Sequence, residues 1–301
     1  DAAAILAAHG LARRGLVDFL GMTVVAGNVG VDLAAKNARI VCDWAGEEDF
    51  PVYAGAVKPL LRELETAEAV HGKTGLDGTA LHEPRCPLQK QHAVAYLVET
   101  LSCAEDASIT LCPIGPLTNI ALALSIAPEA IRAIKRIVLM GGNYFEAGNM
   151  TPAAEFNFFT DPHAAQIVLQ SGAPITILPL DVTHKAQITS ERMNRLRRLK
   201  NANGSRLADI LQSYERFDIQ QFGLEGGPLH DPCAVICAVF PELFSGRMCR
   251  VDVETQSGLS TGACAVDWHG TTGKTPNALW ITEVDADRMF EELTAAIAEL
   301  P

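Results

Sequence analysis

The segment RIVLMGGNYFEAGNMTPAAEFNFFTDPHA, residues 136–164, is the most informative part of the chain for its fold. An apolar run ends at two glycines, and a polar loop then carries Asn149, Glu155 and Asn157 before Asp161-Pro162 opens a helix. In an open parallel sheet, ligands bind just beyond the carboxyl ends of the strands. Amide and carboxylate side chains hydrogen-bond without readily reacting. We therefore expect this loop to hold a polyhydroxylated molecule while other residues supply the chemistry.

Short apolar runs alternate with helical patterns over most of the chain. Strands that are apolar on both faces and interleaved with helices predict an α/β fold with an open, mostly parallel sheet flanked by helices. The predicted strands are 20–26, 52–56, 109–113, 137–140 and 175–180. The predicted helices are 31–45, 93–104, 119–124, 162–170, 205–222 and 232–240.

The C-terminal part has a different pattern. Residues 250–254, 263–268 and 278–283 are predicted as strands of a small C-terminal β extension, which a helix from Ala286 closes. The sequence contains no internal repeat, no low-complexity segment and no linker. We therefore expect residues 1–301 to form a single domain.

Composition favours a cytoplasmic protein with a small-molecule ligand. The net charge is −12 and basic residues are scattered, apart from a short run at 192–200 that we place on a solvated helix face. Nucleic acid needs a broader positive surface, so it is not an expected partner. No apolar stretch is long enough for a membrane span, and no signal-peptide pattern is present. The eight cysteines form no CxxC pair, which favours buried, reduced thiols.

Three places outside the 136–164 segment carry a polar residue beside an expected strand or helix end. Asp1 precedes a helical run and would ordinarily be an N-cap. Asn28 follows a strand and is either a turn residue or an amide that points into the cleft. His71 stands at the base of a glycine-rich loop, 70–78, which could form a lid, although a lone loop histidine is more often at the surface.

Two further places could bind a metal or donate a proton. At 113–119 a strand turns sharply into a helix, which leaves either a backbone carbonyl free for a metal or a plain connection capped by Thr118. Asp231 either caps the helix that Pro232 begins or ligates a metal, and His230 beside it could protonate a leaving group. All five places can converge on one cleft. The remaining histidines, His184 among them, share no ligand spacing, and we treat them as non-catalytic.

Two Gly-Lys-Thr triplets, at 72–74 and 273–275, resemble the end of a phosphate-binding loop. That motif needs a glycine five residues before the second glycine, where this chain has Ala67 and Trp268. No GxGxxG occurs either. Binding of nucleoside triphosphates or dinucleotides is therefore not expected.

With these residues in view, the chain resembles the inosine-uridine-preferring nucleoside hydrolase family. The matching segments follow the family's order over nearly the whole length: TVVAGN at 23–28, HGKTGLDG at 71–78, PIGPLTNIA at 113–121, the block 138–165, LDVTH at 180–184 and LHDP at 229–232. The block 138–165 and LHDP are the most specific. The resemblance implies an open α/β fold and hydrolysis of the N-glycosidic bond of ribonucleosides to ribose and free base, with a bound Ca²⁺.

The resemblance also implies a role for individual residues. Asp1, Asp231 and the carbonyl of Ile114 would be calcium ligands, and His230 would be the acid that protonates the leaving base. A hard cation takes six to eight oxygen ligands, two of which a ribose diol can supply, and it can orient an attacking water. The residues expected to hold the ribose and the base are Asn28, His71, Asn149, Glu155, Asn157 and Phe222.

The sequence departs from the family pattern at its start. The family's general base is the second Asp of a DxDPGxDD motif, and Asp1 matches the last Asp of that motif. We expect a natural protein with roughly a dozen more residues, which would form a strand and its loop. Loss of that strand would leave its neighbours unpaired, and we expect negligible hydrolase activity from a polypeptide that begins at Asp1.

Substrate choice and assembly are less specified. Residues 217–232 resemble the base-facing helix of bacterial members that prefer pyrimidine nucleosides, but Phe222 replaces a tyrosine common there. We expect pyrimidine-preferring or broad activity in nucleoside salvage, and a homodimer or homotetramer. The alternative function is a non-catalytic nucleoside- or ribose-binding relative that lacks the general base. A phosphoribosyl-type transferase would need a glycine loop with basic residues, which the chain lacks.

Overall fold

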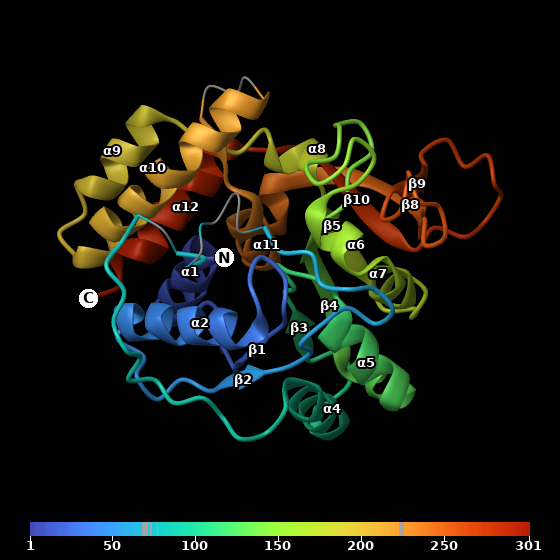
Figure 1. Cartoon of the computed structure of the whole chain (residues 1–301), viewed down its shortest axis with the longest axis horizontal. Helices are drawn as coiled ribbons and strands as arrows, with labels where there is room; N and C mark the ends of the chain where they lie inside the picture. Colours follow the sequence, from blue (N-terminus) through green and yellow to red (C-terminus); the bar gives the residue numbers. More distant parts are fainter. Residues whose placement is uncertain (68–71, 73, 77, 223–225) are drawn as a thin grey trace.

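A computed structural model describes residues 1–67, 72, 74–76, 78–222 and 226–301, except for the side chains of 214–222. Its main sheet has six strands in the order β3-β4-β5-β10-β8-β9 (Figure 1). The first four are mutually parallel; β8 pairs antiparallel with β10, and β9 pairs antiparallel with β8. The strands are β3 (Ile109–Leu111), β4 (Ile134–Met140), β5 (Ile175–Leu178), β10 (Ala278–Val284), β8 (Phe244–Val253) and β9 (Cys264–Asp267).

Helices cover both faces of this sheet. On β4, Val138 and Met140 belong to one hydrophobic cluster, whereas Ile137 and Leu139 belong to the other, as the alternation of a strand requires. The first cluster contains residues of α1 (Ala2–Arg13), α2 (Val31–Ala45), α8 (Leu180–Thr183), α11 (His230–Val239) and α12 (Ala286–Ala298). The second contains residues of α4 (Ala93–Cys103), α5 (Thr118–Ile126) and α7 (Pro162–Leu169). This arrangement confirms the predicted α/β class, and α2 has the predicted bounds.

The C-terminal strands were predicted as a small separate extension, but one of them belongs to the central sheet. Strand β10 pairs in parallel with β5 and is therefore part of the central sheet. Its residues are apolar on both faces, with Trp280 in one cluster and Ile281 in the other. Only β8 and β9 extend the sheet, at the right of Figure 1. Strand β8 begins at Phe244, six residues before the predicted 250. The prediction missed these residues because 245–248 are all exposed and do not alternate between apolar and polar residues.

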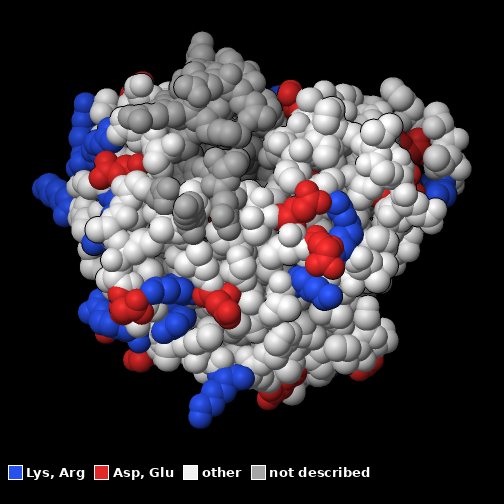
Figure 2. All heavy atoms as spheres, viewed as in Figure 1, with Lys and Arg blue, Asp and Glu red and all other residues white. Residues whose placement is uncertain are grey.

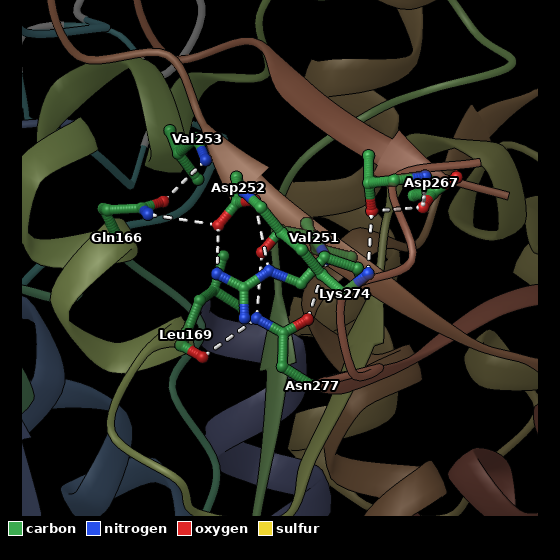
Figure 3. A network of polar contacts seen from close by, with 10 residues as sticks. Gln166, Leu169, Val251, Asp252, Val253, Asp267, Lys274 and Asn277 are labelled. Atoms are coloured by element: carbon green, nitrogen blue, oxygen red, sulfur yellow. Dashed lines mark hydrogen bonds and ion pairs between the residues drawn. The ribbon is translucent and has the colours of Figure 1, made fainter. Parts of the chain in front are cut away.

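A polar network ties this extension to α7 (Figure 3). Asp252 on β8 accepts hydrogen bonds from Arg250, Lys274 and Gln166, and Asn277 donates to the carbonyls of Leu169 and Val251. The hydrogen bond from Arg250 is the main reason that the pKa of Asp252 falls to about 2. The extension is therefore anchored by charge-assisted bonds rather than by apolar packing alone.

Strands β1 (Met22–Val24) and β2 (Val52–Ala54) form a separate parallel pair. Within the described part of the chain, no backbone ladder joins β1 to β3, and residues of both strands line one cavity of about 1380 Å³. The short antiparallel pair of β6 (Gln187–Ile188) and β7 (Gly227–Pro228) was not predicted, because two residues are too few for a periodic signal.

The remaining helices include α9 (Ser190–Arg197), which carries much of the basic run, and α10 (Ala202–Phe222). Arg192 and Arg197 pair with Asp287 and Asp209, and on the face shown in Figure 2 basic side chains commonly lie beside acidic ones. All eight cysteines are free; five are buried, and Cys103 is exposed. None of the helices in the described residues combines the length and the apolar character that crossing a membrane requires.

Candidate active site

The cavity beside β1 and β3 reaches most of the residues predicted for the site. Its lining includes Asp1, Asn28, Ile114, Asn149, Glu155, Asn157, His230 and Asp231. These residues come from five separate places in the sequence, and the tertiary structure brings them together. His71 lies outside the described residues, and so does the side chain of Phe222. The roles assigned to all of these residues remain predictions.

Asp1 occupies the N-cap position of α1, yet its side chain makes no capping hydrogen bond. Its Oδ2 instead accepts a hydrogen bond of 3.1 Å from Nδ2 of Asn28, and its amino group donates to Oδ2 of Asp231. The simpler interpretation of Asp1 as an N-cap is therefore wrong for the side chain. Because the carboxylate is turned away from its own helix, its oxygens face the cavity that Asp231 also lines.

Asp231 does not cap a helix either. Helix α11 begins at His230, its N-cap residue is Leu229, and no side chain caps it. Asp231 therefore lies within the first turn, where the partial positive charge of the helix end favours a carboxylate. Its side chain is 16% exposed. Asp231 therefore uses no oxygen for a helix cap; its Oδ2 accepts from the amino group of Asp1, and the residue lines the cavity.

The carboxylate of Glu155, predicted to bind the substrate, accepts several hydrogen bonds from backbone N–H groups. Gly142 follows the end of β4 with φ +79°, a conformation that favours glycine, and its N–H donates to Oε2 of Glu155 at 2.9 Å. Glu155 also caps the short helix α6 (Phe156–Thr160) through the N–H groups of Asn157 and Phe158. Burial raises the pKa of Glu155 to about 7, although these hydrogen bonds lower it. The helix α6 was missed in a segment that reads as a polar loop.

The two asparagines of the 136–164 segment also hold the backbone in place. Nδ2 of Asn157 donates to the carbonyl of Met140 at 3.1 Å and lies 3.4 Å from the carbonyl of Ile114. Oδ1 of Asn149 accepts from the N–H of Phe156 at 2.9 Å. Asn157 therefore links the end of β4 to the turn after β3, and it fixes the position of the Ile114 carbonyl that was predicted as a ligand.

Asp181, which was not predicted, fastens the loop that carries Asn149. Its Oδ1 accepts from the N–H groups of Tyr144, Phe145 and Glu146, each at 3.0 Å. Its Oδ2 accepts from the indole of Trp280 on β10 at 2.8 Å. A buried carboxylate with four donors is well satisfied. This residue ties the loop after β4 to α8 and to the centre of the sheet.

The surroundings of His230 contain two further residues that the sequence interpretation missed. Nδ1 of His230 lies 2.8 Å from Oγ1 of Thr183, and the rings of His230 and His184 are 5.8 Å apart. His184 lines the cavity and lies 3.6 Å from a carboxylate oxygen of Glu146. Burial lowers the pKa of His184, against the opposing effect of Glu146. The cavity therefore includes His184, which was not among the predicted site residues, and the segment LDVTH contained the signal. Its treatment as non-catalytic stays a prediction.

The oxygen atoms at this end of the cavity suit a hard cation. Asp1 and Asp231 offer carboxylates and Ile114 offers a carbonyl, a donor set typical of calcium sites. Across the described ranges, no group of three or more His, Cys, Asp or Glu side chains could hold a metal ion. A cation here would therefore depend on backbone, substrate or water oxygens beside the two carboxylates.

Comparison with known proteins points to one family. A family model described as inosine-uridine preferring nucleoside hydrolase matches residues 1–291. The pyrimidine-specific ribonucleoside hydrolase RihA of Shewanella sp. (strain MR-7) is 44% identical over 280 residues, which are 93% of this chain and 87% of that protein. RihA of Enterobacter sp. (strain 638) is 42% identical over 279 residues, 92% and 88% of the two chains. The solved structure of the purine-preferring ribonucleoside hydrolase from Gardnerella vaginalis superposes with a TM-score of 0.90 at 28% identity, and the match covers 99% of this chain and 95% of that one.

Proposed function

The chain belongs to the inosine-uridine preferring nucleoside hydrolase family and is a ribonucleoside hydrolase, and from this premise we propose that it cleaves the N-glycosidic bond with a bound Ca²⁺. The observation that carries the proposal is the shared cavity of Asp1, Asp231 and Ile114 with His230 beside them. Neither carboxylate is used to cap its helix. Two carboxylates that cap no helix and a carbonyl fit a hard, oxygen-binding ion better than a soft one.

Calcium at this place would supply coordination to the vicinal ribose hydroxyls and to the attacking water. Asp1, Asp231 and the carbonyl of Ile114 would hold it. Asn28 donates to Asp1 and so restrains the carboxylate on the side of the cavity, while Asn157 restrains the Ile114 carbonyl. Such restraint matters because ligands that are already oriented lose less entropy when they bind.

The residues of the segment after β4 that line the cavity would bind the sugar. Asn149, Glu155 and Asn157 come from one segment whose backbone is fixed by caps and by Asp181. Their amide and carboxylate groups can hydrogen-bond hydroxyls and stabilise the positive charge that develops on the ribose ring during bond cleavage. A rigid wall favours catalysis since small displacements of catalytic groups cost rate.

His230 would donate a proton to the base as it leaves. It begins α11 directly before Asp231, so the proton donor and the proposed ligand are held by the same helix end. A positioned acid contributes about 10²–10⁴-fold to the rate. Protonation matters most for natural bases, which leave poorly as anions.

We propose pyrimidine nucleosides as preferred substrates, with broad activity as the weaker possibility. The relatives named as pyrimidine-specific are 42–44% identical to this chain, whereas the purine-preferring structure is 28% identical. Nucleoside salvage in the cytoplasm and assembly as a homodimer or homotetramer complete the proposal.

The test is a substrate panel of inosine, adenosine, uridine and cytidine with purified full-length protein, before and after treatment with a calcium chelator. We expect release of ribose and free base, fastest from uridine or cytidine, loss of activity with the chelator and recovery with added Ca²⁺. Faster cleavage of inosine would contradict the pyrimidine preference. Nucleoside binding without turnover would contradict the hydrolase activity, and turnover that requires phosphate would indicate a transferase.

A further inference from the structure

We propose that Thr183 is a positioning residue that fixes the orientation of the His230 ring for protonation of the leaving base. The inference rests on the proposed function of His230 and extends it to a residue that does not itself touch the reacting atoms. Oγ1 of Thr183 lies 2.8 Å from Nδ1 of His230, a good hydrogen-bond distance between residues 47 positions apart. Nε2, on the other side of the ring, is then the nitrogen that gives up a proton.

The hydroxyl of Thr183 is itself held rigidly. Thr183 is completely buried at the end of α8, and a β-branched side chain has little rotational freedom. Two residues earlier, Asp181 binds the indole of Trp280 on β10 and three backbone amides of the loop after β4. The short helix α8 therefore fixes the position of the His230 ring relative to the central sheet.

His230 needs such a partner because it is the first residue of α11. Its backbone is fixed, yet its ring can still rotate about two side-chain bonds. The hydrogen bond with Thr183 at Nδ1 restricts that rotation and determines which nitrogen faces the base. A hydroxyl can accept from or donate to Nδ1, so the bond can persist before and after proton transfer. A carboxylate in this place would instead hold the proton on the ring.

The test compares two substrates that differ in their need for a leaving-group acid. Uridine needs protonation of its base, whereas p-nitrophenyl riboside releases a stable anion without it. Thr183→Val removes the hydroxyl and keeps the shape of the side chain. We expect kcat for uridine to fall about 10- to 100-fold, since displacement of a catalytic group costs up to about 100-fold. KM for uridine and kcat for p-nitrophenyl riboside should change less than about twofold. Thr183→Ser, which restores the hydroxyl, should recover most of the uridine activity.

Thr160→Val is the matched control. Thr160 is also a buried threonine on a short helix, but its hydroxyl finds no hydrogen-bond partner among the described residues. The control should leave both activities unchanged. The inference is overturned if Thr183→Val lowers kcat for both substrates equally or lowers kcat for neither. It is also overturned if Thr183→Ser fails to restore kcat for uridine.

His230→Ala separates failure of this inference from failure of the proposed function. It should lower uridine hydrolysis strongly and spare p-nitrophenyl riboside. If His230→Ala shows that selectivity and Thr183→Val does not, only the role of Thr183 is wrong. If His230→Ala lowers kcat for both substrates equally, His230 is not the acid that protonates the leaving base. A wild-type protein inert toward both substrates would contradict the proposed hydrolase activity and this inference with it.

Discussion

Nδ2 of Asn28 lies 3.1 Å from Oδ2 of Asp1, so the amide that follows β1 restrains the carboxylate that precedes α1. Each residue had an ordinary structural interpretation in the sequence, as a turn residue and as an N-cap. In the fold, Asp1 makes no side-chain cap, and both residues line the same cavity. Their contact supports a joint role in ligand binding.

Asn28→Ala should weaken calcium binding about fivefold and raise KM for uridine. The hydrogen bond ends on a charged group, but Asp1 is exposed, so we expect about 1 kcal/mol rather than the larger values of buried sites. Calorimetric titration with Ca²⁺ measures the first effect and initial rates measure the second. Asn194→Ala, at an exposed position on α9, is the control and should change neither. Unchanged calcium affinity in Asn28→Ala would show that the contact does not serve the metal site.

Asp231→Asn should lower calcium affinity by at least about 100-fold, because changes to groups that only orient ligands already cost about 10–100-fold. It should also abolish uridine hydrolysis at calcium concentrations that saturate the wild type. Asp287→Asn removes a carboxylate on α12 that pairs with Arg192 and serves as the control. Equal calcium affinity in Asp231→Asn and the wild type would exclude Asp231 as a ligand.

Asp161→Ala should destabilise the fold by about 2–4 kcal/mol. Asp161 is fully buried and accepts from the N–H of Leu60, the hydroxyl of Thr118 and the N–H of Ala164, so its loss leaves buried donors unpaired. Urea denaturation measures the free energy of unfolding. The control is Asp285→Ala, which removes an exposed N-cap with one bond and should cost about 1 kcal/mol. If both variants lost the same free energy of unfolding, the burial of Asp161 would not add to its contribution to stability.

His9 should make the protein less stable in mild acid. Burial, and secondly Arg13, lower the pKa of His9 to about 4 from 6.5, and its ring packs against Phe19 and Phe50. Between these two values the unfolded chain binds a proton that the folded chain does not. The stability contributed by neutral His9 is therefore complete above pH 6.5 and is lost as the pH falls toward 4.

His9→Phe should remove this component, which amounts to at most about 1.4 kcal/mol per pH unit. The measurement is urea denaturation of both proteins between pH 7.5 and 4. The difference in unfolding free energy between them should be constant above pH 7. Below pH 6.5 the wild type should lose stability relative to the variant. Parallel curves throughout would contradict the lowered pKa of His9.

The sequence by itself determined the features that depend on neighbouring residues. Helix α2 has the predicted bounds, Asp161 caps α7 ahead of Pro162 as the 136–164 segment indicated, and β4 ends at the predicted Met140. The family also followed from short motifs in a fixed order. Periodicity, capping residues and glycine positions are local signals, so they can be read without the fold.

Only the tertiary structure decided which distant residues meet. It joined β10 to β5, turned Asp1 toward Asn28, and brought Thr183 and His184 to His230. A motif such as LDVTH marks the segment but not the partner that each residue contacts, since the contacts depend on how helices and strands pack around the sheet. A residue such as Thr183 looks like an ordinary helix-end threonine in the sequence. Its proposed role follows from a contact across 47 positions that only the folded chain creates.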